Sequence, residues 1–238
     1  MKRSASGSSF VHVSKQALWG AVGLLFSAAA GPAVAGTIVG SAHDFSGRGW
    51  SGGQICVACH TPHGGNTTVA DAPLWNHTVT THTYTLYKSG TLNADPLAQP
   101  SGVSKLCLSC HDGTVAIDSF GGGAGTAGTM SGSKAVGADA QGSLANDHPI
   151  GFTYDTALAS LDGALFDPAT KSVTVGAGGT KSKTGTVASM MLFNGKLECA
   201  SCHDVHNNFT AADGAGVGAP LLRVAKSGST ICLTCHNK

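Results

Sequence analysis

Four units of one five-residue pattern organise the chain: CVACH (56–60), CLSCH (107–111), CASCH (199–203) and CLTCH (232–236). All eight cysteines of the 238-residue sequence lie in these units, and a histidine directly follows the second cysteine of each. Cys-x-x-Cys-His is the attachment pattern of c-type haem, in which two thiols bond the porphyrin edge and the adjacent imidazole binds the iron. The pattern predicts four covalently bound haems.

Each unit supplies two attachment thiols and one proximal iron ligand. The predicted attachment residues are Cys56, Cys59, Cys107, Cys110, Cys199, Cys202, Cys232 and Cys235. The predicted proximal ligands are His60, His111, His203 and His236. Cysteine pairs of this spacing also build zinc ribbons and thioredoxin-like redox sites, but neither requires a histidine directly after the second cysteine. The sequence therefore favours haem over zinc or dithiol chemistry.

Candidate second ligands come from the remaining histidines, and the two halves of the chain echo each other. Each half holds an isolated histidine beside an aspartate, a Cys-x-x-Cys-His-x-x-His unit and a plain unit. This repeated pattern selects four candidate distal ligands, which are His43, His63, His148 and His206. His77 is a further candidate that lies outside the repeated pattern. His63 and His206 follow a proximal histidine by three residues and are expected to serve a neighbouring haem. Bis-histidine ligation of every iron predicts low-spin haems of low potential.

Aspartates adjoin several of these histidines at positions 44, 112, 147 and 204. A carboxylate that accepts the second ring N–H of a ligand fixes the orientation of the imidazole. An aspartate that only caps a turn is the alternative. The sequence leaves open both this choice and the order in which distal and proximal histidines pair.

Residues 1–35 have the organisation of a secretory signal peptide. Lys2, Arg3 and Lys15 form a basic start, and residues 17–30 form an apolar run that is too short for a stable membrane anchor. Residues 33–35 (AVA) provide a small-x-small cleavage site. An uncleaved anchor is the alternative. We expect export through the periplasm to the cell surface or the extracellular space.

Composition limits the remaining options. Cleavage would leave 11 basic against 13 acidic residues, a net charge of −2, which lacks the basic surface that nucleic acid requires. Charged residues make up 11% and aromatic residues 6% of the chain, too few for an ordinary core. We expect a multihaem c-type cytochrome with little regular secondary structure. Short helices at the haem motifs and a few short strands would wrap around a four-haem chain, and folding would depend on haem.

The mature chain, residues 36–238, is expected to form one module with Gly-rich loops near 121–143 and 176–186. Residues 78–87 are rich in β-branched and aromatic side chains and predict a strand, as do residues 151–154 and 172–175. Ser101 or Ser104 is expected to begin a helix that carries the second motif.

The sequence segments in and around the motifs resemble those of a known family. They are HDFS (43–46), CVACHTPH (56–63), APLWN (72–76), CLSCHDGTVAIDSFGG (107–122), NDHPI (146–150) and LECASCHDVHN (197–207). Together they resemble the extracellular tetrahaem c-type cytochromes that polymerise into filaments, the OmcE type of cytochrome nanowire. The resemblance spans essentially the whole mature chain. The long Gly-rich loops and the extra His77 and His82 depart from it.

The resemblance implies stacked and T-shaped haem pairs in one continuous chain and subunits joined head to tail. It also implies that one distal histidine is donated to the next subunit, and His43 is suggested because it lies close to the predicted cleavage site. The predicted function is electron transfer in an extracellular filament, with other redox cytochromes as partners and no enzymatic activity. A monomeric periplasmic shuttle is the alternative, and a multihaem reductase is a weaker one.

Overall fold

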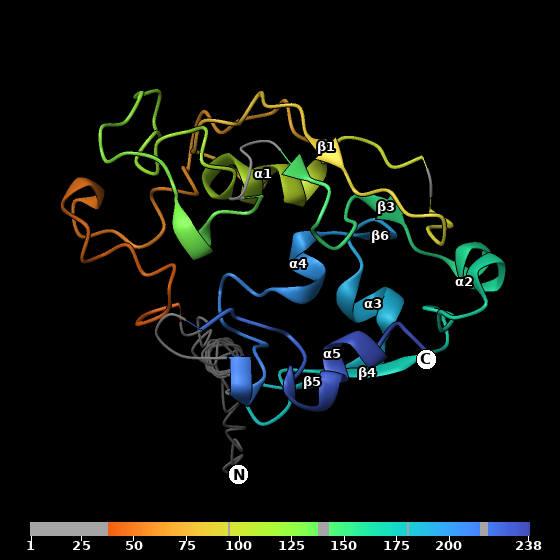
Figure 1. Ribbon diagram of the computed structural model, residues 1–238. Helices are drawn as coiled ribbons and strands as arrows, with labels where there is room; N and C mark the ends of the chain where they lie inside the picture. Colours follow the sequence, from red (N-terminus) through yellow and green to blue (C-terminus); the bar gives the residue numbers. More distant parts are fainter. Residues whose placement is uncertain (1–37, 95, 138–142, 180, 215–218) are drawn as a thin grey trace, which may run out of the picture. The chain divides into compact units, whose positions relative to one another are not determined.

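The computed structural model describes residues 38–94, 96–137, 143–179, 181–214 and 219–238 (Figure 1). The predicted signal peptide and its cleavage site lie outside these residues, as does the 138–142 part of the first Gly-rich loop. Residues Gly36 to Lys238 form one compact unit.

Short helices and strands joined by long loops make up the described chain (Figure 1). The helices are α1 (Gly102–His111), α2 (Thr156–Asp162), α3 (Val187–Met191), α4 (Cys199–Cys202) and α5 (Thr230–Leu233). The strands are β1 (Thr85–Leu86), β2 (Ser143–Leu144), β3 (Phe152–Thr153), β4 (Ser172–Val175), β5 (Lys183–Thr186) and β6 (Lys196–Leu197). Single turns of 3-10 helix occur at Gly49–Ser51, Gly132–Lys134, Ala212–Gly214 and Ser227–Ser229.

The strands form three separate two-stranded sheets. The pair β1–β2 is parallel, whereas β3–β6 and β4–β5 are antiparallel. In β4–β5, Ser172 lies opposite Thr186 and Val175 opposite Lys183, so these strands form a hairpin. The prediction of a loop over 176–186 is therefore wrong for residues 183–186. Strand β4 matches the strand predicted at 172–175.

The segment 78–87 is a strand only at Thr85–Leu86, although its composition predicted more. Side chains bind its backbone in place of a neighbouring strand: Thr80 N donates to Ser109 Oγ (3.0 Å), and Tyr84 N donates to Gln99 Oε1 (2.8 Å). The predicted helix does follow Ser101, which is the N-cap residue of α1 but makes no side-chain capping bond.

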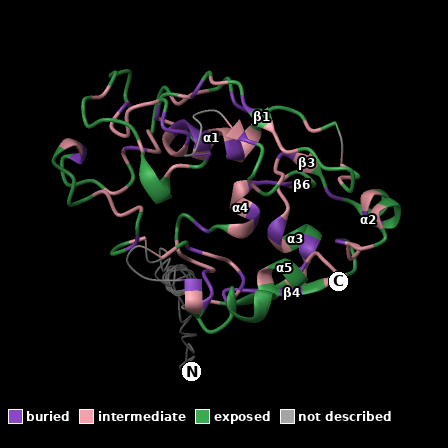
Figure 2. Cartoon of the chain, viewed as in Figure 1, coloured by how far each residue is buried: buried purple, intermediate pink, exposed green. Residues whose placement is uncertain are grey.

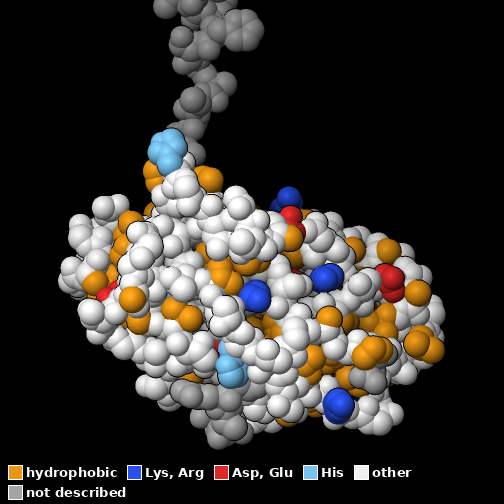
Figure 3. All heavy atoms as spheres, turned by 90° about the horizontal axis from the view of Figure 1, so that it is seen from above, with side chains coloured by type: hydrophobic (Ala, Val, Ile, Leu, Met, Phe, Trp, Pro, Cys, Tyr) orange, Lys and Arg blue, Asp and Glu red, His pale blue; other side chains and the backbone are white. Residues whose placement is uncertain are grey.

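A modest hydrophobic core forms in the second half of the chain. The composition had predicted too few suitable residues for an ordinary core. Its buried side chains are Tyr154, Ala159, Val173, Val175, Val187, Met191 and Val224. Figure 2 shows buried stretches of the chain in purple, among them part of α3. Cys235 of the fourth motif packs against this cluster. A smaller cluster joins Tyr84, Leu108 and Leu144 beside the second motif. Figure 3 shows a face with few charged side chains, scattered singly among polar and hydrophobic ones.

Candidate haem-binding site

Each Cys-x-x-Cys-His unit folds as one turn of helix. The histidine N–H donates to the first cysteine's carbonyl in three units: His60 to Cys56 (2.8 Å), His203 to Cys199 (3.0 Å) and His236 to Cys232 (2.9 Å). The remaining unit lies within α1. Residues three and four positions apart share one side of a helical turn, so both thiols and the imidazole can meet one planar group. This arrangement depends only on local hydrogen bonds.

The rings of three proximal histidines are oriented by backbone carbonyls. Their Nδ1–H groups donate to the carbonyl oxygens of distant residues: His60 to Pro73 (2.7 Å), His111 to Lys134 (2.7 Å) and His203 to Pro220 (2.5 Å). A neutral imidazole that donates through Nδ1 keeps Nε2 unprotonated and able to bind a metal. The acceptors at these three rings are therefore carbonyls and not the neighbouring aspartates considered from the sequence.

The aspartates bind backbone and hydroxyl groups instead. Asp44 accepts bonds from Gly40 N (2.7 Å) and Ser46 N (3.0 Å). Buried Asp112 accepts hydroxyl bonds from Thr80 and Tyr84, and both N–H and hydroxyl bonds from Thr114. Burial would raise the pKa of Asp112, but these bonds outweigh it and hold the pKa below its usual value. These carboxylates thus fix the loops that carry the motifs.

Three pairs of histidine rings lie close together, here called facing pairs, and each pair joins one predicted proximal ligand to one predicted distal ligand. Ring centres lie 6.0 Å apart for His43–His111, 6.1 Å for His60–His206 and 6.4 Å for His148–His236. Two imidazoles that bind one metal ion from opposite sides, at about 2 Å from nitrogen to metal, have ring centres about 6 Å apart. The interplanar angles of 55°, 17° and 72° are compatible, because each ring can rotate about its metal–nitrogen axis.

Two of these six histidines are held neutral. Burial, with smaller contributions from the nearby His111, His203 and His206, lowers the pKa of His43 to about 4. Burial and His148 likewise lower the pKa of His236. A metal binds only the neutral imidazole, so both residues are in the state that ligation needs.

His203, the proximal histidine of the third motif, differs from the other three proximal histidines. Within the described chain, His203 has no facing histidine at a comparable distance, and His63 contacts no other ring. In buried His77, Nδ1 lies 2.8 Å from Thr78 O and Nε2 lies 3.0 Å from Ala116 O. Both partners are carbonyl oxygens, so a neutral imidazole can donate to only one of them, and the role of His77 as a ligand stays a prediction. His82 packs edge-on against Tyr84.

The thiols show which motifs are neighbours. Cys107 and Cys199 lie within hydrogen-bond reach, and this bond together with burial raises the pKa of Cys107. Burial raises the pKa of Cys110 to about 12, with a contribution from nearby Cys59. Burial also raises the pKa of Cys202 to about 11, with a contribution from Cys235. The first motif therefore lies near the second, the second near the third and the third near the fourth.

These pKa directions bear on the dithiol alternative. Catalytic cysteines of redox enzymes have a lowered pKa, because the thiolate is the nucleophile. Here burial raises the pKa of the second cysteine in every motif, to about 11 for Cys59, Cys202 and Cys235 and to about 12 for Cys110. At the first position of the third motif, by contrast, a hydrogen bond from Cys107 lowers the pKa of Cys199. The second cysteines alone therefore argue against thioredoxin-like chemistry.

Helices α1 and α4, which carry the second and third motifs, are joined by a buried polar contact. Glu198, the only glutamate of the sequence, accepts bonds from the backbone N–H of Ser104 (3.2 Å) and from its hydroxyl. Ser104 Oγ in turn accepts a bond from Cys199 N (3.0 Å). This contact joins residues 94 positions apart and was not predicted, although a lone glutamate directly before a motif is a usable signal.

Two unpaired donors also fit a porphyrin, whose propionates are anionic. The buried Nε of Arg223 and the buried Nε1 of Trp75 have no hydrogen-bond partner within the described residues. Arg223 N donates to Cys202 O (2.8 Å), and Trp75 packs edge-on against His60. Each donor therefore lies beside a motif, and the donor set fits haem.

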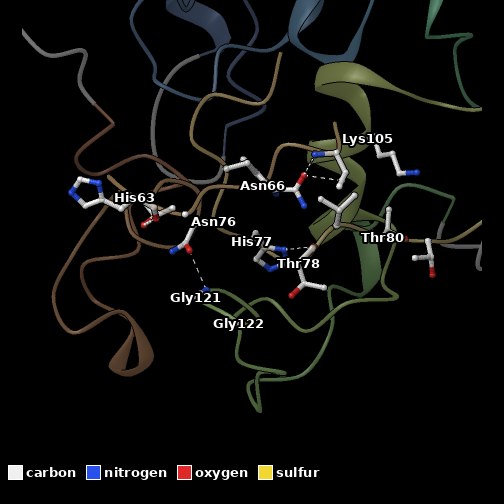
Figure 4. A pocket seen from close by; sticks show the side chains of 15 residues that line it. His63, Asn66, Asn76, His77, Thr78, Thr80, Lys105, Gly121 and Gly122 are labelled. Atoms are coloured by element: carbon white, nitrogen blue, oxygen red, sulfur yellow. Dashed lines mark hydrogen bonds between the residues drawn. The ribbon is translucent and has the colours of Figure 1, made fainter. Parts of the chain in front are cut away.

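A cavity of about 730 Å³ adjoins the second motif (Figure 4). His63, His77 and Lys105 are among the residues that line it, and His77 Nε2 lies 3.4 Å from Cys110 Sγ. Its volume lies in the range of cofactor pockets, but its lining is mostly polar and includes no motif cysteine or proximal histidine, so it does not by itself mark a haem position. The Lys105 ammonium group is a suitable partner for a propionate.

Searches among known proteins gave no further identification. No family model matches the chain, and no curated protein matches it. The described residues contain no cluster of three or more metal-binding side chains, whereas a haem iron needs only two protein ligands. No helix in the described part of the chain is long and apolar enough to cross a membrane.

Proposed function

We propose that the chain is an electron-transfer protein that carries four covalently bound c-type haems. The observation that supports this most strongly is the set of three facing histidine pairs, each of which joins a motif histidine to a histidine outside the motifs. When bound, the haem irons supply one-electron chemistry, and the protein sets their ligation, spacing and surroundings.

If haem is bound, each histidine pair would supply both protein ligands of one iron, which would leave three irons without an open site for a substrate. Electron transfer requires none, whereas a reductase does. The succession of thiols from Cys59 through Cys107, Cys199 and Cys235 supports closely spaced haems along the length of the chain. We therefore propose an electron conduit and not an enzyme.

Assembly with a second copy of the chain would complete the fourth site. His203 is oriented by Pro220 but has no facing histidine in the described chain, and His63 has no ring partner there. The resemblance to filament-forming cytochromes suggested His43 as the donated ligand. Because His43 faces His111 within one chain, we propose that His63 is donated instead, to the His203 haem of the next subunit of an extracellular filament.

Electron microscopy of the haem-loaded, exported protein tests this proposal. We expect filaments from the parent, and separate four-haem subunits from the variant His63→Ala. His82→Ala is the matched control because it removes a histidine that packs only on Tyr84, and it should still form filaments. Discrete single-chain particles from the parent would instead identify a periplasmic shuttle.

A further inference from the structure

The turn between His203 and His206 is held by the carboxylate of Asp204. Asp204 is 7% exposed and accepts bonds from the backbone N–H groups of His206 (3.2 Å), Asn208 (2.9 Å) and Phe209 (2.6 Å). Its carbonyl accepts a bond from Asn207 N (2.9 Å). One side chain thus binds the backbone on both sides of Asn207, which has a positive φ of 54°.

This turn is attached to the same segment that orients His203. Asp204 N donates to Leu221 O (2.8 Å), while His203 Nδ1 donates to the adjacent Pro220 O (2.5 Å). Residues 203 and 204 are therefore both attached to the segment Pro220–Leu221. The carboxylate also holds the backbone of His206, whose ring centre lies 6.1 Å from that of His60.

The corresponding residue of the first motif behaves differently. Thr61 follows His60 as Asp204 follows His203, but its hydroxyl donates to His63 O (2.8 Å) and does not accept the N–H of that residue. His63 has no facing ring in the described chain, whereas His206 has one. The carboxylate is thus present in the unit whose distal histidine meets a partner.

We propose that Asp204 is a positioning residue whose carboxylate places His206 opposite His60. This inference rests on the proposed haem function and deepens it, because it assigns to one buried side chain the delivery of a ligand from the third motif to the first haem. An asparagine cannot replace it. Its amide has one acceptor oxygen, and its NH₂ group would face a backbone N–H that cannot reverse its role.

The test is the spin state of the haem-loaded variants. In Asp204→Asn, four haems should remain, about one iron in four should become high-spin, and the reduced protein should bind about one carbon monoxide per chain. Added imidazole should restore the low-spin state, which a general loss of folding would not allow. Asp118→Asn is the matched control: its carboxylate accepts the N–H groups of Thr126 and Ala127 in a loop without histidines, and all irons should stay low-spin.

Four low-spin irons in Asp204→Asn would overturn the inference while leaving the haem function intact, whereas a parent protein without haem would overturn both. If the variant fails to fold, amide hydrogen exchange of the parent decides the question. The N–H groups of residues 206, 208 and 209 should then be protected, and free exchange at these positions would contradict the role of Asp204.

Discussion

Removal of the Glu198 carboxylate should separate the helices that carry the second and third motifs. Glu198 is 3% exposed and Ser104 is fully buried, so water cannot replace the bonds between them. In Glu198→Ala, the N–H and O–H groups of Ser104 would both lose an ionised acceptor. Hydrogen bonds to charged groups contribute about 1.5–3 kcal/mol each, so we expect a loss of about 4 kcal/mol.

The change should be measured as the melting temperature of the haem-loaded protein. A loss of about 1 kcal/mol lowers this temperature by about 2–4 °C in a chain of this size, so Glu198→Ala should melt about 8–16 °C below the parent. Glu198→Gln keeps an acceptor oxygen but loses the charge, and we expect about half of that decrease. Asp162→Asn is the control, because its partner Asn93 lies at the surface, and it should change stability by less than about 0.5 kcal/mol.

A double-mutant cycle with Ser104→Ala isolates the contact itself. The effects of the two substitutions should be non-additive by about 2 kcal/mol, because both remove the bond from the Ser104 hydroxyl to the carboxylate, whereas the backbone N–H bond of residue 104 is lost only in Glu198→Ala. Additive effects, or a Glu198→Ala variant that melts within 2 °C of the parent, would refute the reasoning.

Three further substitutions test other parts of the account. Asp112→Ala should lower the free energy of unfolding by about 3 kcal/mol, and Asp112→Asn by only about 1 kcal/mol, because two of the hydroxyl partners can accept a bond from the asparagine amide instead of donating one. The difference from the parent should shrink as the pH falls through the lowered pKa of Asp112. A pH-independent difference would contradict this. Gly65→Ala should lower the melting temperature, because the added Cβ would lie 2.8 Å from the backbone of Leu74, whereas Gly90→Ala meets no atom within 4 Å and should not. His148→Ala should open one iron, so that the reduced protein binds about one carbon monoxide per chain; no binding would remove His148 from the ligand set.

Sequence reasoning located what depends on local structure. The spacing of each motif corresponds to one helical turn, closed by a bond such as that from His60 N to Cys56 O, and neighbouring residues suffice to form it. The strand at residues 172–175 likewise follows from its alternating apolar residues, and the structure confirms it.

Contacts between distant segments could not be predicted in the same way. The carbonyls that orient His60, His111 and His203 lie 13, 23 and 17 residues away. Every residue has a backbone carbonyl, so the sequence does not indicate which one will accept the bond. The carbonyl that lies 3.0 Å from His77 Nε2 belongs to Ala116, 39 residues along the chain, and only the folded chain brings the two together. The pairing of β5 with β4 was missed because residues 183–186 are polar and exposed on their first half.

The intact mass of the purified, exported protein tests the central claim most directly. We predict one species whose mass equals the polypeptide without residues 1–35 plus four haem groups, and which keeps that mass under denaturing conditions. A chain that carries zinc, cysteine disulfides or no covalent group in place of the haems would contradict the account.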